Sequence, residues 1–168
     1  YIYIMVALIC SKVVEVDCPK EDFLESIYKP KIWETISPVK KISVEFTAPN
    51  VFFSEIYDEV DLVKMPVEMS GDLVLLDKGE VEGKGRLIEL NVRNNKDVKK
   101  LDGRLRVKSL GPNKTKIGVF ITKFQLTSEF LNMFGDTSDL ILRRKISEIL
   151  RGLQKYCKQS GNSIKDFL

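Results

Sequence analysis

The sequence predicts an α+β fold in which a curved antiparallel sheet lies against helices collected on one of its faces. Two observations predict it. Apolar residues alternate with polar ones through most of residues 39–127, which is the spacing of half-buried strands. Between Leu142 and Tyr156 the apolar spacing changes to three and four residues, which is the spacing of one helix face. Because helices on one side of a sheet make an α+β layering, we expect a single domain over residues 1–168.

The long C-terminal helix is the element around which the prediction is built. Its apolar stripe consists of Leu142, Ile146, Ile149, Leu153 and Tyr156. The opposite face is rich in charged residues, including the run 143–145, which suits solvent. Gly135 is followed by three residues that favour N-caps, so we expect a short lead-in and then a firm helix. Residues 159–168 are expected to form a C-terminal tail.

Two short helices are predicted near the start of the chain. A strand over residues 11–17 ends at Cys18-Pro19, and a helix follows because Phe23, Leu24, Ile27 and Tyr28 recur at helical spacing. Pro30 stops this helix. Trp33 and its apolar neighbours then predict a second short helix that ends before Pro38.

Six strands in a meander are predicted between the short helices and the long one. Turn residues separate them at 49–50, 64–66, 79–85, 94–97 and 111–113. Gly71 lies inside one of these strands and is expected to mark a bulge. With the first strand, the expectation is a curved seven-stranded antiparallel sheet in the order β-α-α-β6-α. A strongly curled sheet cannot touch the long helix everywhere, so an apolar gap between them is a natural product of this layout.

Composition narrows the chemistry that the chain can perform. With 27 basic and 24 acidic residues the net charge is +3, too small and too evenly spread to indicate nucleic acid. The absence of histidine removes the commonest general base and metal ligand, so any catalysis would use carboxylates, Lys, Tyr or Cys. Cys10, Cys18 and Cys157 are odd in number and far apart in sequence, which indicates neither a disulfide framework nor a zinc site. We expect a cytoplasmic protein without a cofactor.

Residues 1–10 form a strongly apolar run. The run is too short to span a bilayer, and no basic residues precede it as they would in a signal peptide. We expect it to be an N-terminal strand extension or a leader that packs on the domain.

Residues 14–38, VEVDCPKEDFLESIYKPKIWETISP, resemble the opening of the START-like (SRPBCC) superfamily of polyketide cyclases and lipid-transport proteins. The matching positions are Asp17, Pro19, Phe23, Ile27, Pro30, Trp33 and Pro38, with Cys18 where the family usually has Ala. The resemblance covers residues 11–158 in architecture but only this opening in motif. It implies a helix-grip fold with a hydrophobic tunnel or pocket between sheet and long helix, used for lipids, hormones, polyketides or quinones. No family motif that fixes a catalytic residue is recognisable.

The leading hypothesis is therefore binding or transport of a hydrophobic small molecule between the long helix and the sheet. The expected wall residues are Trp33, Phe46, Ile56, Ile88, Leu105, Val119, Met133, Leu142 and Ile146. Asp58 could point inward as a polar anchor for the ligand, or a twist could turn it to solvent. Trp33 could equally pack the second short helix onto the sheet.

Two other functions stay open. One is an enzyme of the cyclase type, in which a carboxylate or Tyr moves a proton. The other is a protein-interaction subunit, as in co-chaperones or CoxG-like accessory proteins of similar fold. The cationic residues 143–145 and the ladder of Arg104, Arg106 and Lys108 could attract a membrane surface, although such runs are usually solvated faces. A monomer or a homodimer is expected, with a transient membrane or protein partner as a further expectation.

Overall fold

The computed structural model describes residues 8–60, 65–127 and 135–168. Its elements are β1 (Cys10–Val16), α1 (Lys20–Ser26), α2 (Pro30–Ile36), β2 (Lys41–Ala48), β3 (Val51–Val60), β4 (Met65–Val81), β5 (Gly85–Arg93), β6 (Val98–Gly111), β7 (Lys114–Leu126), α4 (Gly135–Lys158) and the 3₁₀ turn η1 (Ile164–Phe167). This order confirms the predicted one.

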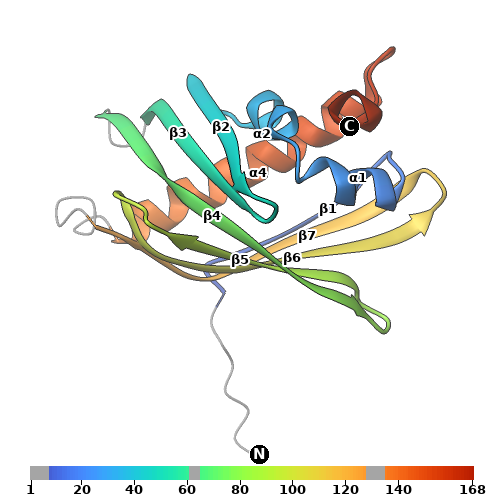
Figure 1. Cartoon of the computed structure of the whole chain (residues 1–168), viewed down its shortest axis with the longest axis horizontal. Coiled ribbons are helices and arrows are strands. Elements are labelled where there is room, and N and C mark those ends of the chain that lie inside the picture. Colours follow the sequence, from blue (N-terminus) through green and yellow to red (C-terminus); the bar gives the residue numbers. More distant parts are fainter. Residues whose placement is uncertain (1–7, 61–64, 128–134) are drawn as a thin grey trace, which may run out of the picture.

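The strands make one antiparallel sheet that curves around one side of α4 (Figure 1). Within the described ranges the sheet has seven strands, in the order β1-β7-β6-β5-β4-β3-β2. The first strand in sequence lies beside the last, since β1 pairs with β7 from Cys10↔Ile121 to Val16↔Thr115. The helices lie on one side of the sheet, with α1 and α2 beside the C-terminal half of α4 (Figure 1). The predicted curved sheet around a long C-terminal helix is thus confirmed.

Register shifts interrupt the pairing in three pairs of neighbouring strands, and such irregularities increase the curvature of a sheet. The register shifts once between β2 and β3, once between β4 and β5 at Asp77 to Gly79, and three times between β6 and β7. The prediction that Gly71 marks a bulge is wrong, because Gly71 pairs in register with Ser54. Glycine is needed there because a Cβ would lie 2.3 Å from the Nδ2 atom of Asn95.

The core lies between the inner face of the sheet and the helices. Strand residues alternate between its two faces, and those that point inward form one buried cluster with α1, α2 and α4. Its most deeply buried members include Val16, Ile27, Ile32, Leu75, Ile88, Val107, Ile117 and Leu153. This is the predicted one-sided core.

Aromatic packing holds α2 on the sheet, and one side-chain hydrogen bond joins α2 to the end of α1. Pro30 occupies the first turn of α2, where its missing N–H leaves no intrahelical bond unmade. The Nε1–H of Trp33 donates to the carbonyl of Ile27 at 2.8 Å, and its ring centroid lies 5.1 Å from that of Phe52 on β3. On the other side of α2, the backbone of Ile36 approaches α4 at Gly152.

The chain ends in a short structured segment. Ser163 and Asp166 form a capping box at the start of η1, and Ile164 and Phe167 bury their side chains in the core. The hydroxyl of Tyr156 on α4 donates to Asp166 Oδ2 at 2.7 Å, which ties the segment to the end of the helix.

Candidate functional site

The inward-facing apolar residues of β4 and β5 become less buried toward the N-terminal half of α4. Ile88 on β5 is 0% exposed, whereas Leu90, the next residue on the same inner face, is half-buried. The same change occurs from Leu75 to Leu73 on the neighbouring strand β4. Because an inward-facing side chain stays accessible only where its neighbours leave space, we infer a groove in this direction along β4 and β5, while Ile121 on β7 remains buried.

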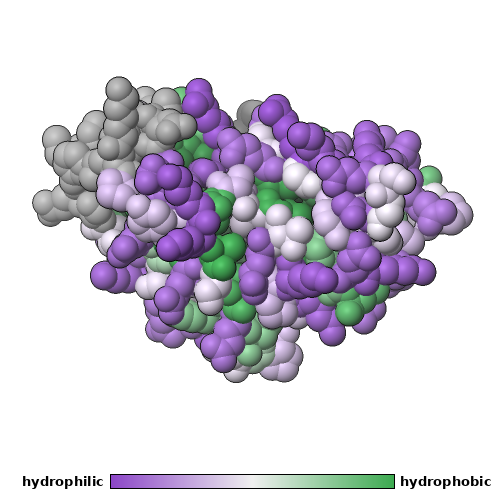
Figure 2. All heavy atoms as spheres, turned by 90° about the horizontal axis from the view of Figure 1, so that it is seen from above, coloured by the Kyte–Doolittle hydropathy of each residue, from purple (hydrophilic) through white to green (hydrophobic). Residues whose placement is uncertain are grey.

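Side-chain burial also decreases along the long helix α4 toward its N-terminus. Leu150 and Leu153 are buried, but Ile146 and Leu142, nearer its N-terminus, are half-buried. We define the apolar groove by the half-buried residues that pack against the core from this side: Phe46, Leu73, Leu90, Val119 and Ile146. Figure 2 shows the molecule from above, and hydrophobic residues are visible there in gaps between hydrophilic side chains near the middle of the view.

A partly buried ion pair joins α4 to β3 at the open end of the groove. Asp58 is only 8% exposed, so of the two alternatives considered for it, the inward one agrees with its placement and the solvent-facing one does not. The ammonium of Lys145 lies 2.6 Å from Asp58 Oδ2 and donates to the carbonyl oxygen of Pro38 at 2.7 Å. The Nζ to Oδ2 contact is close but poorly aligned as a hydrogen bond, so its character is that of an ion pair. Lys145 thus connects β3, the α2–β2 loop and α4.

Sequence reasoning missed Lys145, because it assigned the run 143–145 to the solvent face of the helix. Lys145 comes three residues after Leu142 and four before Ile149, so it stands at the flank of the apolar stripe, where its long stem can lie along apolar surface. A lysine on the flank of the apolar stripe was the signal in the sequence that could have indicated a contact with the sheet. Arg143 is likewise engaged with the fold, since its Nε donates to the carbonyl oxygen of Ile9 at 2.6 Å.

The other predicted site residues fall into three groups. Phe46, Ile56, Val119, Leu142 and Ile146 are half-buried, and all but Ile56 and Leu142 belong to the apolar groove as defined above. Ile88 and Leu105 lie deeper, in the buried core.

The last two predicted site residues stand apart from the groove walls. Trp33 is held by its hydrogen bond to Ile27 and its contact with Phe52, which is the packing alternative considered for it. Met133 lies outside the described residues.

A second polar cluster lies at the end of the sheet covered by α1. Arg86 donates through Nε and Nη2 to the two carboxylate oxygens of Asp77, at 2.9 and 2.7 Å. The guanidinium holds the pKa of Asp77 below its usual value, and burial raises the pKa of the Tyr28 hydroxyl nearby. At neutral pH the carboxyl is therefore ionised and the phenol protonated, so this cluster is a structural ion pair rather than a poised base.

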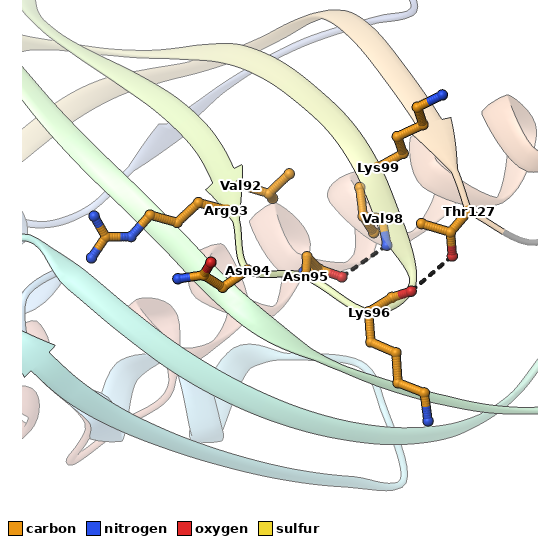
Figure 3. A pocket seen from close by; sticks show the side chains of 8 residues that line it. All are labelled: Val92, Arg93, Asn94, Asn95, Lys96, Val98, Lys99 and Thr127. Atoms are coloured by element: carbon orange, nitrogen blue, oxygen red, sulfur yellow. Dashed lines mark hydrogen bonds between the residues drawn. The ribbon is translucent and has the colours of Figure 1, made fainter.

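An open depression of about 460 Å³ lies at the turn between β5 and β6, and its lining includes Val92, two residues after Leu90 on β5. Its polar groups serve the turn: Asn95 Oδ1 accepts from the backbone N–H of Val98, and the Thr127 hydroxyl donates to the carbonyl of Lys96 (Figure 3). Arg93, Lys96 and Lys99 point in different directions (Figure 3). Their charges therefore do not converge on one ligand.

Within residues 8–60, 65–127 and 135–168, no cluster of three Cys, Asp or Glu side chains is arranged to hold a metal ion, and the sequence has no histidine. None of the helices in the described part of the chain is long and apolar enough to cross a membrane.

Comparison with known proteins identifies the fold. No protein-family model matches the chain, and no curated protein sequence does. Among solved structures, a START superfamily protein from Mycobacterium smegmatis is 14% identical with a TM-score of 0.59, over 89% of this chain and 96% of that one. The chain has the START-like, helix-grip fold.

Two further START-like structures broaden the comparison. The Zhui aromatase/cyclase from Streptomyces sp. R1128 is 12% identical with a TM-score of 0.63, over 91% of this chain and 96% of that one. The STAR-related lipid transfer protein from Xanthomonas axonopodis is 9% identical with a TM-score of 0.61, over 89% of this chain and 85% of that one. At such identities the likeness establishes the fold, while the use of the groove has to be argued from this chain's own residues.

Proposed function

We propose that the protein binds a hydrophobic small molecule in the apolar groove between α4 and the sheet. The observation that carries the proposal is the gradient of burial: inward-facing apolar residues such as Leu90 and Ile146 stay half-buried beside a filled core. A ligand that covered them would remove apolar surface from water, worth about 25 cal/mol per Å² before ordering costs. Similar folds in a lipid transfer protein and an aromatase/cyclase support a ligand of this kind.

The ion pair at the open end indicates that the ligand also has a polar end. An ammonium has three N–H donors. Lys145 donates to the carbonyl of Pro38 and lies beside the carboxylates of Asp58 and, at 4.0 Å, Glu148, and its side chain is 30% exposed, so an N–H remains accessible to a ligand oxygen. The proposed ligand is therefore amphipathic, with an apolar body in the groove and a carbonyl, hydroxyl or carboxylate at Lys145, as in a lipid, a quinone or a polyketide-like molecule.

A fluorescent probe tests the groove directly. The neutral dye N-phenyl-1-naphthylamine should bind the wild-type chain with a saturable rise in fluorescence. Ile146→Arg should abolish this rise, because a guanidinium in the apolar groove would be buried without a partner. Leu140→Arg is the matched control, since Leu140 lies on the same helix but is exposed. Equal dye binding by both folded variants would overturn the proposal.

The second candidate function is an enzyme of the cyclase type. Asp58 favours it, because a buried carboxylate beside the groove, next to an ammonium, could move a proton on a bound substrate. Turnover of a polyketide substrate that is lost in Asp58→Asn, while N-phenyl-1-naphthylamine still binds, would support the enzyme. Binding of the dye without turnover of any offered substrate supports the binding protein.

A further inference from the structure

The fold brings together two cysteines from opposite ends of the chain. Cys18 follows β1 and is 1% exposed, whereas Cys157 lies in the last turn of α4 and is half-buried. Both belong to the same core cluster, and their thiols are hydrogen-bonded to each other. Cys10, which is also buried, is not part of that cluster.

Hydrogen bonds hold the backbone on both sides of the thiol pair. The hydroxyl of Thr115 donates to the carbonyl of Cys18 at 2.6 Å, and the N–H of Cys18 donates to the carbonyl of Val16 at 2.9 Å. From α4, the side-chain amide of Gln154 donates to the carbonyl of Glu15 at 3.0 Å. The end of β1 and the last turns of α4 are thus fixed relative to each other, with the two sulfur atoms between them.

The two thiols differ in a way that assigns their chemical roles. The hydrogen bond from Cys18 lowers the pKa of Cys157, and the same hydrogen bond together with burial raises the pKa of Cys18. Cys157 is therefore the sulfur that deprotonates first, and it is also the more accessible of the two. A thiolate, not a thiol, is the nucleophile toward an oxidant.

We propose that Cys18 and Cys157 are a reversible redox pair that forms an intramolecular disulfide when the protein meets hydrogen peroxide. The Cys157 thiolate attacks one peroxide oxygen, the O–O bond breaks, and hydroxide leaves and takes up a proton to become water. The resulting sulfenic acid is attacked by the sulfur of Cys18, which loses its proton, and a second water leaves as the S–S bond forms. In sum, two thiols and one peroxide give one disulfide and two waters, and an added dithiol reverses the change.

The bond would join the last turn of α4 to the end of β1 and so constrain the unfolded chain over most of its length. The model of loop-closure entropy predicts a larger stabilisation for longer loops. We therefore expect the oxidised protein to unfold at a temperature about 5 °C higher or more. The apolar groove lies toward the other half of α4, so this effect does not depend on the proposed ligand.

The test uses the full chain with hydrogen peroxide at near-equimolar concentration. The count of free thiols in denaturant should fall from three to one, and peptide mapping should recover Cys18 linked to Cys157. Cys10→Ser is the matched control and should still form the link. Cys157→Ser and Cys18→Ala should not form it, and the rise in unfolding temperature should be absent from both and reversed in the wild type by dithiothreitol.

Three results would overturn the proposal: an unchanged count of three thiols in the wild type, a link that involves Cys10, or disulfides only between chains. The mapping on the wild-type chain needs no substitution, so it decides the matter even if a buried variant fails to fold.

Discussion

Because Lys145 and Asp58 form an ion pair, we predict that replacing Lys145 destabilises the protein more than replacing Asp58. Lys145→Met removes the cation from a carboxylate whose side chain is 11% exposed. Breaking a fully buried pair costs about 3–5 kcal/mol, and because the side chain of Lys145 is 30% exposed we expect a smaller loss of about 2–3 kcal/mol. Asp58→Asn leaves an ammonium that keeps its hydrogen bond to Pro38 and can reach water, so its expected loss is only about 1–2 kcal/mol.

Urea unfolding at neutral pH measures these losses in the free energy of unfolding. The double variant should lose less than the sum of the two single variants by about 1 kcal/mol or more, because the second substitution removes the group that the first left unpaired. Arg144→Met is the matched control: Arg144 is an exposed cation on the same helix, and its loss should change stability by less than about 0.5 kcal/mol. Equal effects of Lys145→Met and Arg144→Met, or strict additivity, would refute the assignment of a buried pair.

Three further predictions concern the packing and the charges. Gly71→Ala should destabilise by about 1–3 kcal/mol because its Cβ would meet a side chain and backbone at 2.3–2.7 Å, whereas Gly111→Ala, with nothing within 4 Å, should be near neutral in the same urea titration. Ile88→Ala should lose about 3–4 kcal/mol and Leu90→Ala clearly less, since only the first leaves a closed cavity; equal losses would argue against a groove. Asp77→Asn should lose at most about 1 kcal/mol, because the side chains of Arg86 and Asp77 are 34% and 37% exposed and solvent screens the pair. Because the pKa of Asp77 is lowered on folding, the difference from wild type should be present above about pH 4 and should shrink as the pH falls through the folded pKa; an effect that grows in acid contradicts this.

The element order could be read from the sequence because a one-sided core imposes its period on the chain. Alternation over 39–127 and the three-four spacing after Leu142 are direct consequences of burying one face of each element. Gly71 was misassigned because glycine serves both bulges and close approaches, and only the three-dimensional neighbour Asn95 separates the two.

The depth of the core could not be read in the same way. Ile88 and Leu90 are equivalent in the pattern, and their burial differs because one lies in the filled core and the other where α4 leaves room. The contact between Cys18 and Cys157 was likewise invisible, since the sequence separates them and only the folded chain brings the end of α4 back to the end of β1. Asp58 was identified as a candidate anchor, but its partner Lys145 was not, because the helical pattern assigned that lysine to solvent.

Native mass spectrometry of the purified chain, before and after extraction with organic solvent, shows whether the apolar groove holds a ligand. We expect an additional mass of a few hundred daltons that disappears on extraction and returns when a long-chain fatty acid is added to the extracted protein. Leu140→Arg should retain this mass and Ile146→Arg should lose it. A bare chain mass in the purified sample, together with no uptake of the fatty acid by the extracted protein, would mean that the groove binds no such ligand.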